Sequence, residues 1–422
     1  MKVYKFGGAS VNSAEGVRQV VRITAACADK LVMVVSAMGR TTDKLEEVVK
    51  AYAGRNTDVA LNILAESESY HSEIIKGLFP EDAKLTLQKT SEIFSSVKRF
   101  IAANDRHEYD FCYDQIVSAG ELLSTLIVCD YMESTEMKCR WIDARKWMKT
   151  DSAFREAGVR LDKTAKELLR ILNFDETDCF ITQGFIGSNA AGESTTLGRE
   201  GSDYSAAIIA SLAGAESLTV WKDVPGIMNA DPRIFPNARL LPKLSYMETA
   251  ELSYYGAQVL HPKTIKPLVN AEVPMFVKSF VTPEAEGTLI ASNQVIERKI
   301  PVTVVKRNQL LISVLPKDFS FVLEDALVEI LLLLQKHRLK IHLIQSSPLC
   351  ISLCVDDERN ARSAIDELGV HLGEVRYNEG LELITIRNYS EQLISEHTAG
   401  RERIVMQRDR STVRILVKNP KS

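Results

Sequence analysis

The sequence has 422 residues, of which 45% are hydrophobic and 26% are charged. This composition excludes a disordered chain and a collagen-like repeat, and the length suggests two or three domains. Lysine and arginine number 52 against 56 aspartate and glutamate residues, giving a net charge of −4. Such a chain carries no global field for nucleic acid or an anionic membrane, so we expect neither as a partner.

Signals for targeting and for disulfide chemistry are absent from the sequence. The longest apolar run, Ala326 to Leu334, is interrupted by Glu329 and is far shorter than the roughly 18 residues of a membrane span. The first five residues include two lysines where a signal peptide would turn apolar, so we expect a cytoplasmic protein. Seven cysteines without a CxxC pair are typical of reduced thiols, and we expect neither disulfides nor a structural metal.

The first half of the chain alternates β and α segments. Val3 to Phe6 is a short apolar strand that ends at Gly7 and Gly8. Glu15 to Ala26 has apolar residues at helical spacing, and Leu31 to Val35 is the continuous aliphatic run of a strand buried on both faces. The order indicates an α/β fold with a mostly parallel sheet between helices.

Further elements of this kind continue to residue 292. Residues 43 to 104 read as two or three long helices, and strands follow at Arg140 to Ile142, Cys179 to Phe185 and Ser217 to Trp221. We therefore predict one large α/β domain over residues 1–292.

A polar stretch, Ser292 to Lys299, separates this domain from a part with a different order of elements. Residues 300–388 predict the order βαββαβ, a ferredoxin-like arrangement common in regulatory modules. The tail, residues 389–422, offers one helix and up to two strands. It is too short to bury a core alone, so we expect it to dock on the chain or to pair with another subunit.

Most familiar phosphate-binding and catalytic motifs are missing. The chain has no GxGxxG, HExxH or GxSxG, and the segment Gly187 to Ser194 resembles a P-loop but has Glu193 in place of its lysine. We interpret that segment as a hairpin turn. Lys5, Gly7 and Gly8 at the end of the first strand can cradle a phosphate, or the glycines can simply make a tight turn.

At these residues the chain resembles a known family. The segment Lys5 to Val11 is similar to the opening motif of aspartate kinases, which have the amino-acid kinase fold. The predicted βαββαβ unit resembles the ACT regulatory domain that follows the catalytic domain in that family. The resemblance continues in order through 36–39, 117–122, 182–187, 195–204, 223–226 and 259–262.

The resemblance implies transfer of the γ-phosphoryl group of ATP to the side-chain carboxylate of L-aspartate, with Mg²⁺ bridging phosphate oxygens. Two anions must then meet, and unit charges ~4 Å apart repel by about 4 kcal/mol at an effective dielectric of ~20. Neutralisation by cations is therefore the main catalytic task. No general base is needed, because the carboxylate is already ionised at neutral pH.

By resemblance, Lys5 contacts the transferred phosphoryl group together with the Gly7 and Gly8 amides, while Asp203 orients Lys5 and Ser202 helps to hold the substrate. Each residue also has a simpler interpretation from its local pattern. Lys5 can be a lysine at a strand end whose charge reaches solvent, and Ser202 and Asp203 can be ordinary capping residues of the helix that follows.

Four more residues are assigned to aspartate by resemblance: Arg199 to its α-carboxylate, Glu121 to its amino group, and Thr42 and Ser36 to the pocket. From the residues alone, Arg199 can be a surface arginine and Thr42 a neighbour of a helix cap. Ser118 and Glu121 also fit a capping box ahead of a helix from Leu122 to Cys129.

The resemblance also marks positions around ATP, and three of them depart from the family pattern. Lys222 stands where threonine is common, Met228 where tyrosine is common, and Gln258 where a lysine is expected. We favour Lys222, or Lys263 nearby, as compensation for the missing cation; Ala9 also replaces a threonine. The positions assigned to ATP, besides Lys5, Gly7 and Gly8, are Lys222, Asp223, Met228, Arg233, Gln258 and Val259.

The ACT resemblance implies an amino-acid effector, bound between the turn 316–318 and the strand 341–344, and a homodimer. Thr412 to Lys418 is the strand we expect to be exchanged in such a dimer. Lysine-sensitive relatives carry an acidic residue near His342 and a Ser-Glu pair where this chain has Ser347 and Pro348. We therefore expect weak or absent feedback by lysine.

Two other functions stay open from the sequence. One is a kinase for another acidic amino acid, such as glutamate or N-acetylglutamate, although Glu121 argues against an acetylated substrate. The other is an amino-acid sensor that kept the fold and lost or weakened catalysis.

Overall fold

The computed structural model describes residues 1–256, 260–292, 300–316 and 325–418, which form two compact units. The first unit comprises Met1–Ile227, Leu240–Ser253 and the described part of Gln258–Ile296. The second comprises Met228–Arg239 and the described parts of Tyr254–Ala257 and Glu297–Ser422. The predicted domain boundary at residue 292 stays a prediction, because residues 293–299 lie outside the described residues.

The first unit is built on a sheet of eight strands in the order β3-β4-β2-β1-β7-β9-β10-β8. Neighbouring strands are parallel except β9 and β10, which confirms the predicted mostly parallel sheet. The strands are β1 Lys2–Phe6, β2 Leu31–Val35, β3 Cys139–Ile142, β4 Cys179–Gln183, β7 Ser217–Lys222, β8 Lys243–Leu244, β9 Met275–Ser279 and β10 Thr288–Ile290.

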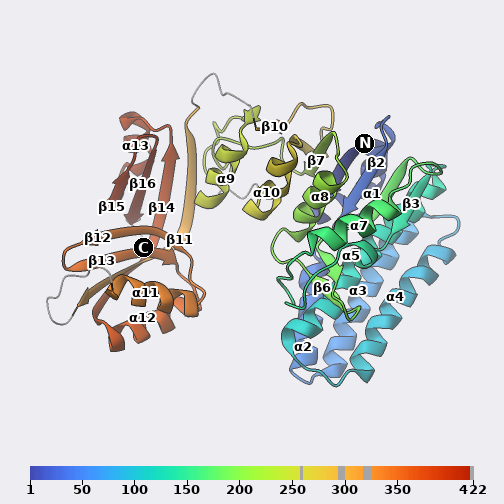
Figure 1. Cartoon of the computed structure of the whole chain (residues 1–422), viewed down its shortest axis with the longest axis horizontal. Coiled ribbons are helices and arrows are strands. Elements are labelled where there is room, and N and C mark those ends of the chain that lie inside the picture. Colours follow the sequence, from blue (N-terminus) through green and yellow to red (C-terminus); the bar gives the residue numbers. More distant parts are fainter. Residues whose placement is uncertain (257–259, 293–299, 317–324, 419–422) are drawn as a thin grey trace. The chain divides into compact units, whose positions relative to one another are not determined.

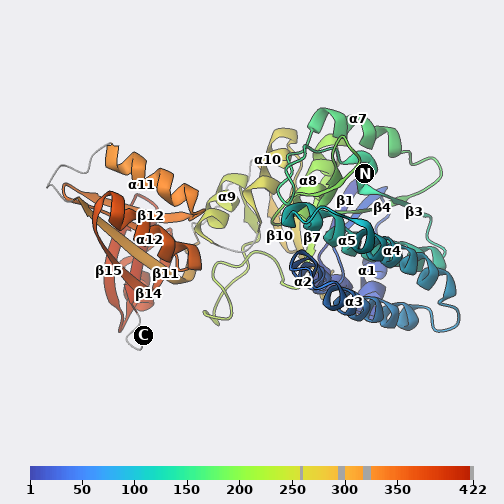
Figure 2. The same ribbon diagram turned by 90° about the horizontal axis from the view of Figure 1, so that it is seen from below.

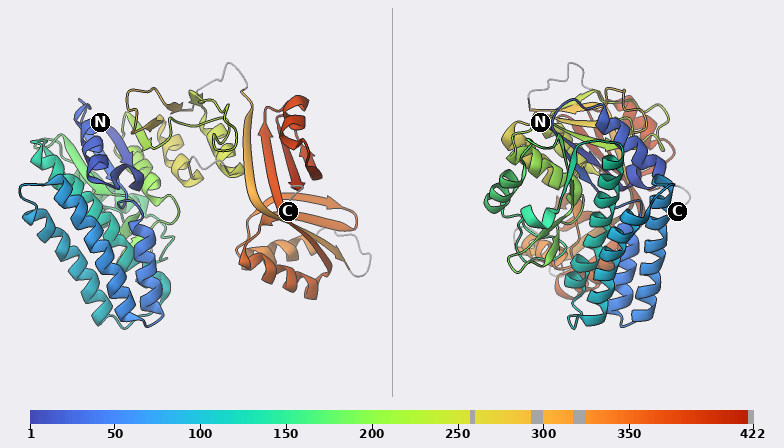
Figure 3. Two further views of the ribbon diagram at one scale, coloured as in Figure 1. Left: turned by 180° about the vertical axis from the view of Figure 1, so that it is seen from behind. Right: turned by 90° about the vertical axis from the view of Figure 1, so that its right-hand side faces the viewer.

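Helices cover both faces of this sheet. Figure 2 shows α8 and α10 on one side and α1 and α3 on the other. The expected helices of residues 43–104 are three, α2, α3 and α4, and they lie beside α5 in the blue to teal part of Figure 3. The helices are α1 Ala14–Ala25, α2 Thr41–Ala53, α3 Thr57–Leu78, α4 Lys84–Ala103, α5 Tyr109–Ser134, α6 Ala144–Trp147, α7 Leu161–Ile171, α8 Gly201–Leu212, α9 Tyr246–Tyr255 and α10 Pro262–Ala271.

The core of the first unit follows from the apolar runs in the sequence. All five residues of β2 are buried, as its continuous aliphatic sequence predicted. On one face Phe6 and Trp221 stack with ring centroids 6.0 Å apart, and side chains of α1 and α5 pack against them. Such packing fixes the carboxyl ends of β1 and β7 side by side.

A short hairpin stands beside the main sheet. Its strands are β5 Ile186–Ser188 and β6 Ser194–Thr196, which pair antiparallel. The hairpin confirms the interpretation of residues 187–194 as a turn and not as a phosphate-binding loop.

The second unit holds a sheet of six strands in the order β12-β13-β11-β14-β16-β15. Its first six elements follow the predicted order βαββαβ, and the long strands β11 and β14 extend past that module in Figure 1. The elements are β11 Val302–Pro316, α11 Asp325–Lys336, β12 Ile341–Ser347, β13 Cys350–Asp356, α12 Arg359–His371, β14 Gly373–Arg387, α13 Glu391–Thr398, β15 Glu402–Arg408 and β16 Thr412–Lys418.

The tail docks on its own chain. β16 pairs with the second half of β14, from Leu381 opposite Lys418 to Arg387 opposite Thr412. The exchange of Thr412 to Lys418 in a dimer stays a prediction. The alternating apolar residues of β16 pack against Ile384 and Ile386 of β14, and Ile394 of α13 completes this small core.

Among the helices that the structure describes, none is both long enough and apolar enough to cross a bilayer.

Candidate active site

A buried ion pair lies at the carboxyl end of β1. Lys5 is 8% exposed, and its Nζ lies 2.6 Å from Oδ1 of Asp203, which is 3% exposed. Asp203 is in the first turn of α8, and Lys222 at the end of β7 places its Nζ 3.9 Å from the other carboxylate oxygen. Burial alone would raise the pKa of Asp203, but Lys5 and Lys222 outweigh it and hold the pKa below its ordinary value.

The two glycines after β1 have different structural roles. A Cβ on Gly8 would lie 2.5 Å from the carbonyl oxygen of Ala37 and 2.9 Å from that of Gly39, so only glycine fits there without a backbone shift. A Cβ on Gly7 would meet only the Nζ of Lys5, at 3.7 Å. Gly8 therefore seats the turn against the loop after β2, and Gly7 leaves space beside the ammonium group.

Glu121 is buried in the middle of α5, and its Oε2 has no hydrogen-bond partner. Burial raises the pKa of this carboxyl to about 8, although the backbone N–H of Ala37 and the charge of Lys5 favour the ionised form. The capping-box interpretation of Ser118 and Glu121 is wrong, because α5 runs without a break from Tyr109 to Ser134. A buried acid with a free oxygen is suited to receive a cationic ligand group.

The remaining predicted aspartate contacts lie in neighbouring segments of the first unit. Ser36 follows β2, where its N–H donates to Phe6 and its carbonyl accepts from Ser124. Thr42 is the second residue of α2, and Ser202 is buried in the first turn of α8. Arg199 is exposed, and within the described part of the chain its guanidinium makes no ion pair.

Asp114, which was not among the predicted site residues, holds the segment that carries Arg199. This fully buried carboxylate accepts hydrogen bonds from the N–H and hydroxyl of Thr196, at 2.8 and 2.6 Å, and from the N–H of Arg155. Burial raises its pKa to about 6 against these donors. The available signal was an aspartate within a segment rich in apolar residues, Phe111 to Val117.

The predicted nucleotide positions are only partly brought together. Lys222 joins the ion pair, and Asp223 follows it as an exposed residue. Met228 and Arg233 belong to the second unit, where Arg233 pairs with Asp231 at 2.8 Å. Gln258 and Val259 lie outside the described residues.

Known proteins similar to this chain indicate which family its candidate active site belongs to. A model of the amino acid kinase family matches residues 1–279. Lysine-sensitive aspartokinase 3 of Escherichia coli K12 is 30% identical over 396 residues, which are 91% of this chain and 86% of that protein. The aspartokinase of Chlamydia pneumoniae is 32% identical over 373 residues, or 87% and 80%.

This chain belongs to the aspartokinase family. The solved structure of E. coli aspartokinase III in complex with aspartate and ADP has a TM-score of 0.83 to this aspartokinase at 26% identity. The match covers 99% of this chain and 96% of the other. The fold predicted from the resemblance, an amino-acid kinase fold with a further C-terminal sheet, is confirmed.

The described carboxylates near the ion pair of Lys5 and Asp203 do not form a complete set of ligands for a metal ion. Asp203 already faces two lysines, and among the described residues no three acidic, histidine or cysteine side chains gather there closely enough to hold a cation alone. The site fits a Mg²⁺ ion that keeps waters and arrives on the nucleotide phosphates.

The two glycines allow a matched test of this geometry. We expect Gly8→Ala to lower the midpoint of thermal unfolding, because its methyl group collides with two backbone carbonyls. The backbone of Gly7 is extended, with φ −80°, so Gly7→Ala should keep the wild-type midpoint of thermal unfolding. It should weaken ATP binding, because the methyl group fills the space beside Lys5. Thermal unfolding and nucleotide titration measure both effects, and equal midpoints for the two variants would contradict this assignment.

Proposed function

We propose that this chain catalyses the aspartate kinase reaction. It transfers the γ-phosphoryl group of ATP to the side-chain carboxylate of L-aspartate and forms 4-phospho-L-aspartate. The observation that carries the proposal is the buried Lys5–Asp203–Lys222 cluster next to an acid with an unpartnered oxygen, Glu121. The E. coli relative solved with aspartate and ADP supports the same substrates.

The cluster supplies the positive charge that the reaction needs. An aspartate carboxylate oxygen attacks the γ-phosphorus, the bond from phosphorus to the β,γ-bridging oxygen breaks, and ADP leaves with the electron pair. Lys5 stabilises the charge on the transferred group, with the amides of Gly7 and Gly8 beside it. Asp203 fixes the position of Lys5, and a Mg²⁺ ion bound with the nucleotide would neutralise phosphate charge.

Recognition of aspartate follows from the charges of its α-carbon. Glu121 accepts from the α-ammonium group, and Arg199 on the segment held by Asp114 binds the α-carboxylate as a planar fork. Ser36, Thr42 and Ser202 complete the pocket. An N-acetylated amino acid has no ammonium group to satisfy the buried Glu121, so the geometry disfavours it.

We assign the contacts to ATP from the positions of these residues in the family's motifs. Lys222 is the cation we assign to ATP in place of the expected lysine at Gln258, and its 3.9 Å approach to Asp203 supports a role beside the transferred phosphoryl group. Asp223, Met228, Arg233 and Val259 are assigned to ATP by the family resemblance alone.

A catalytically weakened sensor and a glutamate kinase are not favoured. The ion pair of Lys5 and Asp203 is intact, and a protein that only senses amino acids has no use for a cation cluster at a phosphate-binding turn. The aspartokinases of E. coli and C. pneumoniae each align over most of this chain, 91% and 87% of it.

The wider setting also belongs to the proposal. We infer a cytoplasmic homodimer that opens the route to lysine, threonine and methionine, with an ACT-type regulatory domain at residues 300–388 and a docked tail at 389–422.

In the second unit His342 is buried, and its Nε2 lies 2.8 Å from Asp356 and 3.0 Å from Nζ of Lys306.

Replacing the ammonium group of Lys5 tests catalysis directly. We expect Lys5→Met to lower kcat by about 100- to 1,000-fold, the usual cost of removing one preorganised charge donor from a transition state. Lys2→Met is the matched control on the same strand, because Lys2 pairs with Asp29 at the surface and should leave turnover unchanged. A coupled ADP-release assay measures both, and unchanged turnover in Lys5→Met would contradict the mechanism.

Glu121 should make aspartate binding depend on pH. Its pKa of about 8 means that the carboxyl is protonated in the free protein at lower pH, whereas an ammonium ligand binds the ionised form. The KM for aspartate should therefore fall as pH rises from about 6 to about 8. Glu121→Gln should abolish this trend and raise KM about 10- to 100-fold, the value of one charge-assisted hydrogen bond; a steep trend in the Gln variant would refute the role.

Feedback by lysine should be weak or absent. His342 and Lys306 place cationic or neutral groups around Asp356, and both lower the pKa of that carboxyl although burial opposes them. Among the described residues, the acid at this position, Asp356, is thus already paired and is not free for a cationic effector. Turnover measured against lysine concentration tests this, with His342→Asp as the variant expected to gain sensitivity; strong inhibition of the wild-type protein by physiological lysine would show the expectation to be wrong.

A further inference from the structure

Four of the seven cysteines lie near the amino ends of the strands in the first unit, away from the cluster around Lys5. Cys139 begins β3 and is the register partner of Cys179, which begins β4. Cys129 on α5 has its Sγ 3.7 Å from that of Cys139. Cys27 lies just before β2 and lines a neighbouring pocket together with Cys179.

An acidic side chain completes a group of three around the closest pair of thiols. Glu133 follows Cys129 by one helical turn on α5, so both residues share one face of the helix. Oε1 of Glu133 lies 3.9 Å from Sγ of Cys129, and the ligand atoms of Cys129, Glu133 and Cys139 all lie within 4.8 Å of one another. Within the described residues this is the one such group of histidine, cysteine or acidic side chains.

We propose that Cys129, Cys139 and Glu133 form a binding site for one thiophilic divalent cation of the Zn²⁺ class. The donor set is two thiolates and one carboxylate, ligand types that zinc accepts, and it leaves a fourth position for water. This inference replaces our expectation of a chain without a metal site, which rested on the absence of a CxxC pair. It is independent of the proposed kinase activity.

The separations between the atoms fit tetrahedral zinc. With Zn–S bonds of about 2.3 Å, two sulfurs of a tetrahedral site stand about 3.8 Å apart, and the observed separation is 3.7 Å. A Zn–O bond of about 2.0 Å requires roughly 3.5 Å between sulfur and oxygen. Glu133 is exposed and can rotate to close the remaining few tenths of an ångström from 3.9 Å.

The surroundings are consistent with proton exchange for a metal. The hydrogen bond shared with Cys139, together with burial, raises the pKa of the Cys129 thiol. Binding would release both thiol protons and place the metal charge against two thiolates and the Glu133 carboxylate. Asp130 is not a ligand, because its two oxygens accept from Lys89 and Thr86 at 2.7 and 2.8 Å.

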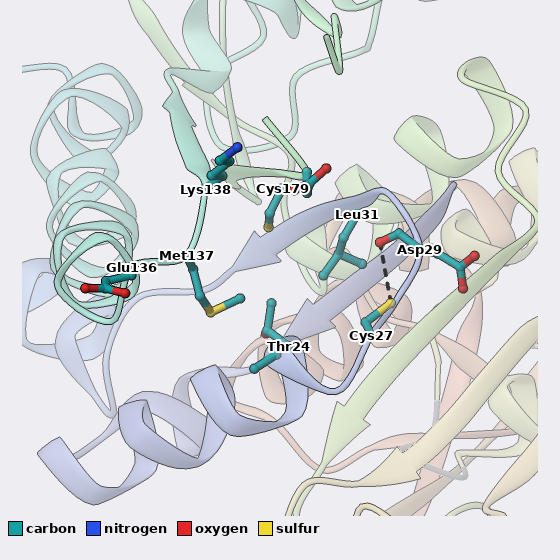
Figure 4. A pocket seen from close by; sticks show the side chains of 10 residues that line it. Thr24, Cys27, Asp29, Leu31, Glu136, Met137, Lys138 and Cys179 are labelled. Atoms are coloured by element: carbon teal, nitrogen blue, oxygen red, sulfur yellow. Dashed lines mark hydrogen bonds between the residues drawn. The ribbon is translucent and has the colours of Figure 1, made fainter. Parts of the chain in front are cut away.

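The neighbouring thiols provide a contrast. Figure 4 shows Cys27 and Cys179 in a pocket of about 380 Å³, where the Cys27 thiol donates to the backbone carbonyl of Asp29. Glu136, also labelled there, lines the same pocket and is exposed. Neither Cys27 nor Glu136 belongs to the group of three, so both can serve as controls.

Zinc titration of the full chain, reduced with a phosphine and competed against a chromophoric chelator, tests the site. We expect one Zn²⁺ per chain, and Co²⁺ in its place should show thiolate charge-transfer and tetrahedral d–d bands. Glu133→Gln, a surface change that leaves the fold intact, and Cys129→Ser should lose the binding. Glu136→Gln and Cys27→Ser should retain it.

Thermal unfolding gives a second readout. Zn²⁺ should raise the unfolding midpoint of the wild-type protein and of the two controls, but not that of Glu133→Gln. The proposal is overturned if the reduced wild-type chain binds no Zn²⁺, if Glu133→Gln and Cys129→Ser bind as the wild type does, or if the Co²⁺ complex lacks thiolate bands. Kinase turnover is a separate measurement, so loss of this site leaves the proposed function standing.

Discussion

The ion pair between Lys5 and Asp203 is the constraint on which the rest of the site depends. Two charges this deeply buried are stable only when each faces a partner, and removing one leaves the other unpaired. Two lysines share the single carboxylate of Asp203, while burial keeps Glu121 largely protonated below a pH of about 8. The side chains of this cluster therefore carry excess positive charge, which favours the binding of anions such as a nucleotide phosphate and a dicarboxylic acid.

Close backbone approaches bring these charges together. Because β1 and β7 are parallel and in register, Lys5 and Lys222 lie at the carboxyl ends of their strands, where α/β folds bind ligands. Gly8 lets the turn after β1 touch the loop after β2. Gly184 does the same for α8, because a Cβ there would lie 2.6 Å from Cα of Ser202. The charge cluster is thus a consequence of strand order and of small residues at contact points.

The sequence predicts the scaffold better than the site. Apolar runs and glycine pairs predict β1, β2 and the hairpin, since these depend on local pattern. Glu121 was open to a capping interpretation because α5 is buried over most of its length and its polar residues do not mark one exposed face, so that periodicity reveals no helix boundary. Asp114 was missed because its partners lie 41 and 82 residues away. The pairing of β16 with β14 is likewise a long-range choice that composition cannot decide.

Helix α5 connects these observations physically. Asp114 and Glu121 are seven residues apart, close to two turns, so they project from one face toward the Arg199 segment and toward Lys5. Cys129 and Glu133 lie further along the same helix, of which 26 residues span about 39 Å. A cation bound there would tie the end of α5 to the start of β3. The helix that positions both buried carboxylates would then be held near the amino ends of the strands. Phosphoryl transfer is proposed at their carboxyl ends.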